Sequence, residues 1–229
     1  MVGKLLLGRC DYFAAMLPDI VTAVFLALCL LAFFGFNLYN LAKHRRSKRT
    51  VTVKAEVEMP RGPIFVLAAF GTLVFFAESI LYVPMVLLGF QWVLTDSILQ
   101  LRFAFDSYVQ LAGMVLTGSG YFLFVWSVLS RGKYATSWAM SENHKLVTWG
   151  PYRYVRHPSY LAYFILFAGL FMMLLNMVAV VPFLAIPGYV GMTKSEEELL
   201  ARRFGEEYRK YQRVTGRFFP KKSKRINVI

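Results

Sequence analysis

Residues 142–160, ENHKLVTWGPYRYVRHPSY, hold the side chains best suited to chemistry. Imidazole, guanidinium and phenol groups lie here beside a Gly-Pro turn and a His-Pro step. Pro158 has no amide hydrogen and suits the first turn of the apolar helix that follows. The free N–H groups at such a helix start favour an anion or a carboxylate, with Arg156 and His157 beside it. An ordinary membrane-interface loop, in which Tyr, Trp, Arg and His are common, is the equal alternative.

A second polar cluster, Glu196-Glu197-Glu198, opens a predicted helix near the C-terminus. Acidic residues are favoured at a helix N-terminus by the helix dipole, and this alone explains most such runs. A functional interpretation requires one glutamate to turn back toward the loop, where it would accept hydrogen bonds from a ribose or pair with a cation. Arg217, followed by Phe-Phe-Pro, is a third candidate. The sequence contains no metal-site or phosphate-loop motif, so no metal is predicted.

The elements that position these residues are predicted to be membrane helices. Apolar residues make up 57% of the 229 residues and charged residues 17%, and the mean hydropathy is positive. A core of this size cannot hide so much apolar surface, so the bilayer is the expected solvent. The net charge of +13 fits loops that face anionic lipid better than it fits a nucleic acid partner.

Hydropathy predicts an all-α membrane bundle with about five transmembrane helices. The expected segments are 20–41, 63–94 (one span plus an interfacial piece near Trp92), 107–129, and a helical hairpin over 159–191 that turns near Asn176. Glu78 is costly at membrane depth and is expected to face the bundle interior. Gly113, Gly118 and Gly120 suit close helix packing.

Most of the 26 Lys and Arg residues lie in segments 42–62, 131–158 and 192–229. The positive-inside rule therefore predicts these segments to be cytoplasmic, with the N-terminus outside and the C-terminus and candidate site inside. Residues 193–215 have apolar side chains near helical spacing and a capping-box pattern, which predicts an amphipathic helix beginning near Thr193 or Ser195. Such a helix would lie along the membrane surface and cover the mouth of the bundle.

The ordered motifs HKLVTWGPYRYVRHPSY (144–160), EEELLARRFGEEY (196–208) and RFFP (217–220) resemble the isoprenylcysteine carboxyl methyltransferase family, a group that also takes in phospholipid N-methyltransferases. The resemblance covers roughly residues 105–220. It implies a methyltransferase-like membrane core over 105–229 with a C-terminal cytoplasmic helix, preceded by transmembrane helices and a basic loop in 1–104.

The resemblance also implies the cofactor, the substrate class and the site. S-adenosylmethionine would bind at the cytoplasmic side, and a lipophilic or lipidated acceptor would enter from the surrounding membrane lipids. The catalytic residues implied are Arg156, Glu196 and Arg217. The cofactor-binding residues implied are His144, Leu146, Val147, Gly150, Tyr152, His157, Pro158, Tyr160 and Glu197.

Two positions depart from the family pattern. Ala162 stands where the family often has Gly, and Met192 stands where carboxyl-methylating members resemble one another in an Arg. An acceptor carboxylate favours the two-pronged grip of Arg, and the nearest cation in the sequence, Lys194, does not supply it. The acceptor atom, carboxylate or amine, therefore stays open.

Two alternatives to a methyltransferase remain. Membrane sterol and isoprenoid reductases resemble the same region and use NADPH, although the acidic run at 196–198 suits a 2′-phosphate poorly. A non-catalytic membrane scaffold that keeps the fold is the second alternative, and Met192 is its best support.

Overall fold

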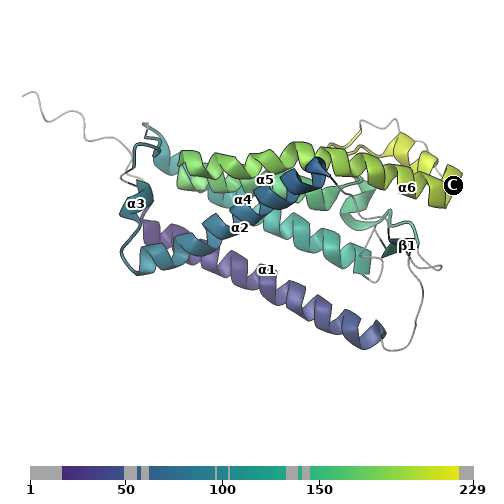
Figure 1. The fold of residues 1–229 in the computed structure, drawn as a ribbon, viewed down its shortest axis with the longest axis horizontal. Helices are drawn as coiled ribbons and strands as arrows, with labels where there is room; N and C mark the ends of the chain where they lie inside the picture. The colour runs from purple at the N-terminus through teal and green to yellow at the C-terminus, as the bar shows by residue number, and fades with distance from the viewer. Residues whose placement is uncertain are drawn as a thin grey trace, which may run out of the picture.

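The computed structural model describes residues 17–48, 56–57, 62–95, 97–102, 104–132, 139–140 and 145–221. The long helices are α1 (Asp19–Lys48), α2 (Pro63–Leu87), α4 (Asp106–Arg131), α5 (Pro158–Leu174) and α6 (Ala185–Val214). The short elements are β1 (Glu56–Val57), α3 (Trp92–Thr95), β2 (Ala139–Met140) and the 3₁₀ helices η2 (Gly150–Arg153) and η3 (Met177–Leu184). Figure 1 shows α4, α5 and α6 running along one common axis, whereas α1 and α2 are inclined to it and α1 diverges from the other helices at one end.

The predicted all-α membrane architecture is confirmed. Within the described residues, four segments are long and apolar enough to cross a membrane: Asp19–Asn40, Pro63–Leu87, Asp106–Arg131 and Met177–Val214. The fifth, Pro158–Leu174, is a shorter apolar helix. Its 17 residues lie at the lower end of the length that spans a hydrocarbon core. The strands β1 and β2 form one antiparallel pair, with Glu56 opposite Met140. The chain is therefore an integral multi-pass membrane protein.

The predicted hairpin between α5 and α6 turns at Leu175, which has a φ of 48°, and Asn176. The Asn176 side chain accepts a hydrogen bond from the amide of Val178 at 2.9 Å and so caps η3. Its amide nitrogen donates to the carbonyl of Leu94 at 3.1 Å. The amide of Met177 donates to the carbonyl of Leu99 at 3.0 Å, so the turn is fixed against α3 and the connection that follows it.

Small residues let the helices approach backbone to backbone, as predicted for two of the three α4 glycines. A Cβ at Gly113 would lie 2.6 Å from the amide nitrogen of Met173, and one at Gly120 would lie 2.7 Å from Cγ of Leu166. At Gly118 the nearest atom, in Phe25, is 3.8 Å away, which is ordinary contact. Close packing therefore joins α4 to α5, and Gly118 has no part in it.

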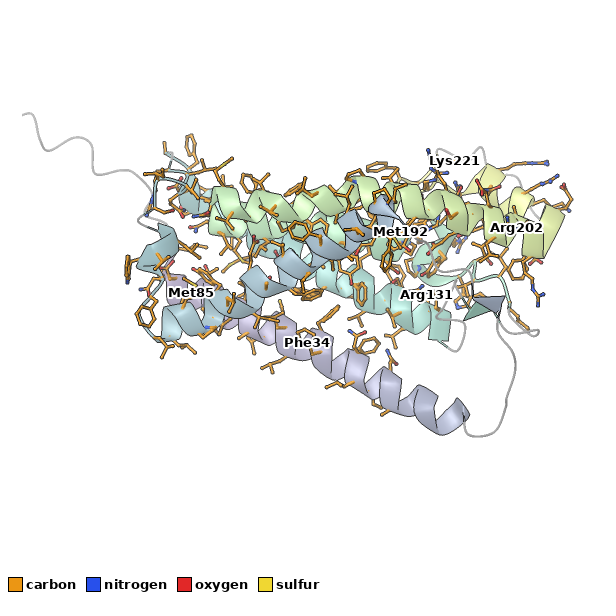
Figure 2. The ribbon with its side chains drawn as sticks, viewed as in Figure 1. Phe34, Met85, Arg131, Met192, Arg202 and Lys221 are labelled. Carbon is orange, nitrogen blue, oxygen red and sulfur yellow. The ribbon has the colours of Figure 1, made fainter. Side chains whose placement is uncertain are left out.

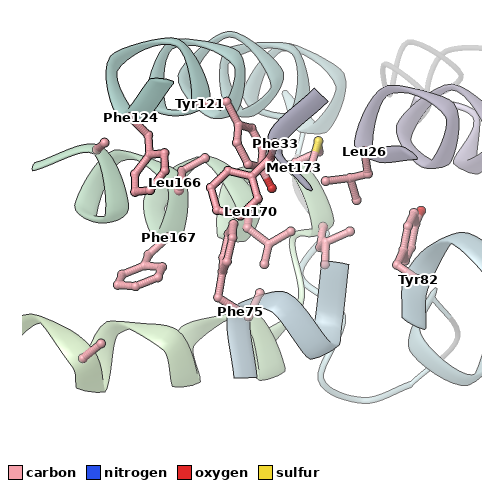
Figure 3. Close-up of a cluster of buried hydrophobic side chains, with 14 of the residues drawn as sticks. Leu26, Phe33, Phe75, Tyr82, Tyr121, Phe124, Leu166, Phe167, Leu170 and Met173 are labelled. Atoms are coloured by element: carbon pink, nitrogen blue, oxygen red, sulfur yellow. The ribbon is translucent and has the colours of Figure 1, made fainter. Parts of the chain in front are cut away.

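The core of the bundle is aromatic and aliphatic, with Phe33, Phe75, Phe124, Leu166 and Phe167 among its buried side chains (Figure 3). Both carboxylate oxygens of Glu78 are buried as well, which confirms that this side chain points inward. Close packing of these buried side chains holds α4, α5 and α6 in fixed positions relative to one another.

The C-terminal helix differs from the prediction both in where it begins and in the direction in which it runs. It does not begin near Thr193, because the Thr193 hydroxyl donates to the carbonyl of Val190 inside a continuous helix that starts at Ala185. The preceding residues are apolar, so the second arm of the hairpin simply continues. Figure 1 shows this arm running along the axis of the bundle and past the end of α5. The prediction of a separate surface helix over 193–215 is therefore wrong.

Gly205 interrupts α6 with φ 52° and ψ −122°, a conformation that side chains with a Cβ rarely adopt. The chain reverses here. Gln212 would lie about 22 Å from Glu197 along a straight helix, yet its amide nitrogen is 3.3 Å from the Glu197 carboxylate. The last helical turns therefore fold back over residues 196–197.

Candidate active site

The site begins with the loop that precedes α5. Gly150 has a φ of 61°, and a Cβ there would collide with the Ser130 side chain at the end of α4. The Trp149 indole donates to the Ser130 carbonyl at 2.9 Å. Tyr152 is buried, and its carbonyl accepts a hydrogen bond from the Tyr211 hydroxyl at 2.6 Å. The loop is thus clamped between the end of α4 and the folded-back part of α6.

The segment that follows α6 lies beside the Arg-His-Pro step. Val155 and Gly216 form a parallel bridge. The amide of Arg156 donates to the carbonyl of Gly216 at 2.8 Å, and the amide of His157 donates to the carbonyl of Arg217 at 3.1 Å. Arg217 is therefore adjacent through its backbone to Arg156 and His157, from which it lies some 60 positions away in the sequence.

Glu197 is the centre of the polar cluster, and only 7% of the residue is exposed. Its Oε1 accepts from Arg156 Nε at 3.0 Å and lies 3.0 Å from His157 Nε2. Arg217 donates to both carboxylate oxygens, from Nε to Oε1 at 3.1 Å and from Nη2 to Oε2 at 2.9 Å. The side-chain amide of Gln212 also donates to Oε2. Charge-assisted, bidentate contacts of this kind are the strong ones. Glu197 therefore organises the cations around it.

Glu196 joins the same cluster from the preceding position. Its Oε1 accepts from the Tyr160 hydroxyl at 2.6 Å, and its Oε2 lies 3.3 Å from His157 Nδ1. Burial alone lowers the pKa of His157, but the hydrogen bonds and charges of Glu196 and Glu197 outweigh it and raise the pKa above 6.5. Both ring nitrogens face carboxylate oxygens, an arrangement that favours the imidazolium form of His157.

The expected contact between the Arg-His-Pro step and the glutamates is confirmed by these distances. Pro158 is buried at the first position of α5, as predicted. Leu146 and Val147 are half-buried on the loop. His144 lies outside the described residues.

Sequence reasoning did not single out Gln212 or Tyr211 as members of this site. Their contacts depend on the reversal at Gly205, which brings the Gln212 amide to the Glu197 side chain, 15 positions away, and the Tyr211 hydroxyl to the carbonyl of Tyr152, 59 positions away. The unfavourable glycine inside a helical pattern was the only signal available.

An apolar cavity of about 350 Å³ opens between α2 and α6. It is lined by Phe65, Ala68, Ala69, Thr72, Leu73, Phe76, Tyr189 and Met192. The Tyr189 hydroxyl lies 2.7 Å from Thr72 Oγ1, and its ring stacks on Tyr160 with centroids 4.8 Å apart. Tyr160 in turn bonds Glu196, so the tyrosine pair connects the cavity to the polar cluster.

The polar cluster around Glu197 thus lies at one end of the helix bundle and is connected through Tyr160 and Tyr189 to an apolar cavity. Residues 111–202 match the sequence model of the isoprenylcysteine carboxyl methyltransferase (ICMT) family. The resemblance found in the sequence motifs is thus confirmed by an independent match over residues 111–202.

Two relatives support the same assignment. The chain is 37% identical over 75 residues to the protein-S-isoprenylcysteine O-methyltransferase of Schizosaccharomyces pombe, covering 32% of this chain and 32% of that protein. It is 38% identical over 76 residues to protein-S-isoprenylcysteine O-methyltransferase B of Arabidopsis thaliana, covering 32% of this chain and 39% of that protein. The chain thus spans well under half the length of these curated relatives.

A solved structure of a eukaryotic intramembrane Ras methyltransferase, ICMT, also aligns with the fold. The sequence identity is 23% and the TM-score 0.45, and the alignment covers 71% of this chain and 54% of that one.

Proposed function

We propose that this protein is a membrane-embedded, S-adenosylmethionine-dependent methyltransferase that acts on a lipophilic, prenyl-type acceptor. The observation that carries the proposal is the contact of Glu196 and Glu197 with the Arg-His-Pro step, next to an apolar cavity. The names of the two relatives, both protein-S-isoprenylcysteine O-methyltransferases, support it.

The charge balance of the cluster suits one group of such a cofactor, its carboxylate. Arg156, His157 and Arg217 carry three positive charges against the two carboxylates of Glu196 and Glu197, which leaves one positive charge for an anionic ligand group. S-adenosylmethionine has a carboxylate of this kind and, when bound, supplies a methyl group activated by a sulfonium. The 145–157 loop, clamped on α4, would line its adenosine part.

The chain's own residues would mainly align the reactants and exclude water. Arg217 and the folded-back end of α6 close the cluster from one side, and the loop closes it from the other. In this proposal Arg156, Glu196 and Arg217 stand next to the reacting groups, and Glu197 holds the two arginines in place.

The acceptor is proposed to be one that needs no base. His157 directs both ring nitrogens at carboxylates and so has no free site to accept a proton from an amine. A carboxylate needs no deprotonation at neutral pH. The prenyl-like chain of such an acceptor would fill the cavity lined by Thr72, Tyr189 and Met192.

The end of the bundle that carries the site is proposed to face the cytoplasm, because basic side chains such as Arg131, Arg202 and Lys221 gather there (Figure 2). Reporter fusions to the C-terminus, scored for activity on either side of the membrane, test this orientation. An extracytoplasmic C-terminus would contradict it.

Isothermal titration of the detergent-solubilised protein tests the cofactor. We expect S-adenosylmethionine to bind with a Kd of roughly micromolar or tighter, and NADPH not to bind. A heat of binding measured for NADPH but not for S-adenosylmethionine would support the reductase alternative. If neither compound gives a heat of binding, the non-catalytic scaffold would be favoured.

A cavity-filling variant tests the acceptor site separately. Ala69→Trp should raise the KM for a prenylcysteine acceptor and leave the Kd of the cofactor unchanged. Leu81→Trp is the matched control, because Leu81 lies on the same helix, is 58% exposed and does not line the cavity. Equal effects of the two variants would place the acceptor elsewhere.

A further inference from the structure

Arg131 is a cation at the site end of the bundle that the cluster around Glu197 does not use. It is the last residue of α4, and Figure 2 shows it at the same end as Arg202 and Lys221. Its Nη2 donates to Ser159 Oγ at 3.2 Å, and that hydroxyl lies 2.7 Å from Ser127 Oγ. A guanidinium has five N–H donors, and a neutral serine is a weak partner for it.

The Nε of Arg131 is buried and has no hydrogen-bond partner within the part of the chain that the structure describes. Leaving a buried charged donor unsatisfied is costly. Among these described residues Arg131 forms no ion pair with a carboxylate either. Glu197 is taken by Arg156, His157, Arg217 and Gln212, and Glu196 by Tyr160 and His157.

The position of Arg131 joins the loop to the cluster. Its neighbour Ser130 holds the loop through the indole of Trp149. Its partner Ser159 directly precedes Tyr160, whose hydroxyl donates to Glu196. The guanidinium of Arg131 therefore lies between the loop and the turn of α5 that carries Tyr160.

We propose that Arg131 binds a carboxylate of a ligand in this site, with its unpaired Nε as one prong of the grip. Planar guanidinium groups match carboxylates by two parallel N–H bonds, which an ammonium group cannot reproduce. The inference rests on the proposed function, which offers two sources of the group: the carboxylate of S-adenosylmethionine and the carboxylate of the acceptor. Either source would satisfy the buried donor.

Paired ligands that differ only by the carboxylate separate these sources. The full chain and Arg131→Gln are titrated with S-adenosylmethionine and its decarboxylated analogue, and with N-acetyl-S-farnesylcysteine and its methyl ester. We expect the substitution to weaken one carboxylate ligand by about tenfold or more, while its carboxylate-free counterpart changes by less than about twofold. The affected pair identifies the source.

Arg131→Lys keeps the charge without the planar fork and should fall between wild type and Arg131→Gln. Arg209→Gln is the matched control, because Arg209 forms an exposed ion pair with Glu206 at 3.0 Å, and its ligand affinities should not change. Equal weakening of both members of each pair, or no change in either, would overturn the carboxylate role.

The wild-type titrations keep the two proposals distinguishable. If wild type fails to bind either cofactor form, the proposed function fails, and the prenylcysteine pair still tests Arg131. If wild type binds none of the four ligands, both proposals are refuted.

Discussion

Glu197 and Glu78 both have carboxylate oxygens withdrawn from solvent, yet Glu197 accepts hydrogen bonds from four side chains whereas Glu78 has no hydrogen-bond partner among the described residues. The first lies where α5 and α6 meet the loop, and the second lies in α2. Burial of a charged group is stabilising only where partners replace water. The two residues therefore have opposite roles in the same bundle.

The regions around them differ in the same way. At the site end the backbone of the loop, the C-terminal segment and the cluster are linked by hydrogen bonds. In α1 the Thr22 hydroxyl and the Asn40 amide nitrogen are also buried without partners among the residues described. At the site end polar groups fix one geometry, with Arg131 Nε as a buried exception. The helices α1 and α2 pack mainly through apolar side chains, together with a hydrogen bond from the Tyr82 hydroxyl to Asp19 at 3.0 Å.

Among the substitutions that test this contrast, Glu197→Gln should have the largest effect on stability and on cofactor binding. The substitution keeps the shape but removes the charge that compensates buried Arg156 and His157. Removing one partner of a buried ion pair costs about 3–5 kcal/mol. We expect a lower thermal unfolding midpoint and at least about tenfold weaker binding of S-adenosylmethionine, measured by calorimetry in detergent.

Glu206→Gln provides the control for this change. Glu206 forms exposed ion pairs with Arg209 and Arg213, and such pairs are worth about 0–1 kcal/mol. Similar losses from Glu197→Gln and Glu206→Gln would show that the cluster has no special place in the fold.

Gly205→Ala tests whether the reversal of α6 assembles the site. At φ 52° and ψ −122° a Cβ is strained, at a cost of about 1–2 kcal/mol. The fold-back that carries Gln212 should loosen, so the affinity for the cofactor should fall severalfold while the membrane helices stay folded. Circular dichroism and titration of the same sample check both expectations.

Gly35→Ala, in α1, is the matched control, because an added Cβ at Gly35 would have no atom of the described residues within 4 Å. It should leave the affinity unchanged and stabilise the helix slightly. Unaltered binding in Gly205→Ala as well would mean that the fold-back has no part in the site.

The contrast also explains how much the sequence could predict. Lipid requires long apolar helices, so segment 107–129 predicted α4 within a few residues. Segment 20–41 predicted the apolar part of α1, but the helix continues through basic residues to Lys48. The turn at Asn176 followed from an apolar run too long for one span. The grouping of Arg156, His157 and Glu197 came from the family resemblance, because no periodicity links residues some 40 positions apart.

Other features had no such signal. The chain reversal depends on the conformation of Gly205 alone, and the helical pattern continues on both sides of it. Without that reversal, Gln212 and Tyr211 look like ordinary helix-surface residues. Arg131 looked like one basic residue of a cytoplasmic loop, because its isolation from carboxylates is a property of three-dimensional packing.

The pH dependence of stability should differ between the two regions. Because the pKa of His157 is raised above 6.5 by Glu196 and Glu197, its contribution is complete below pH 6.5 and is lost as the pH rises through the raised value. The unfolding midpoint of wild type should therefore fall with rising pH above that point. In His157→Gln, which cannot ionise, this part of the slope should vanish. Parallel slopes in the two proteins would contradict an imidazolium at the centre of the cluster.

Glu78→Gln should have the smallest effect and sharpens the comparison most directly. The same substitution that disrupts the cluster at Glu197 removes no hydrogen bond at Glu78 within the described structure, and it replaces a group that is expensive at membrane depth. The unfolding midpoint should stay the same or rise, and the Kd for S-adenosylmethionine should not change. A loss of stability comparable to that of Glu197→Gln would mean that a partner of Glu78 supports the fold. The contrast between the polar site end and the apolar pair of helices α1 and α2 would then no longer hold.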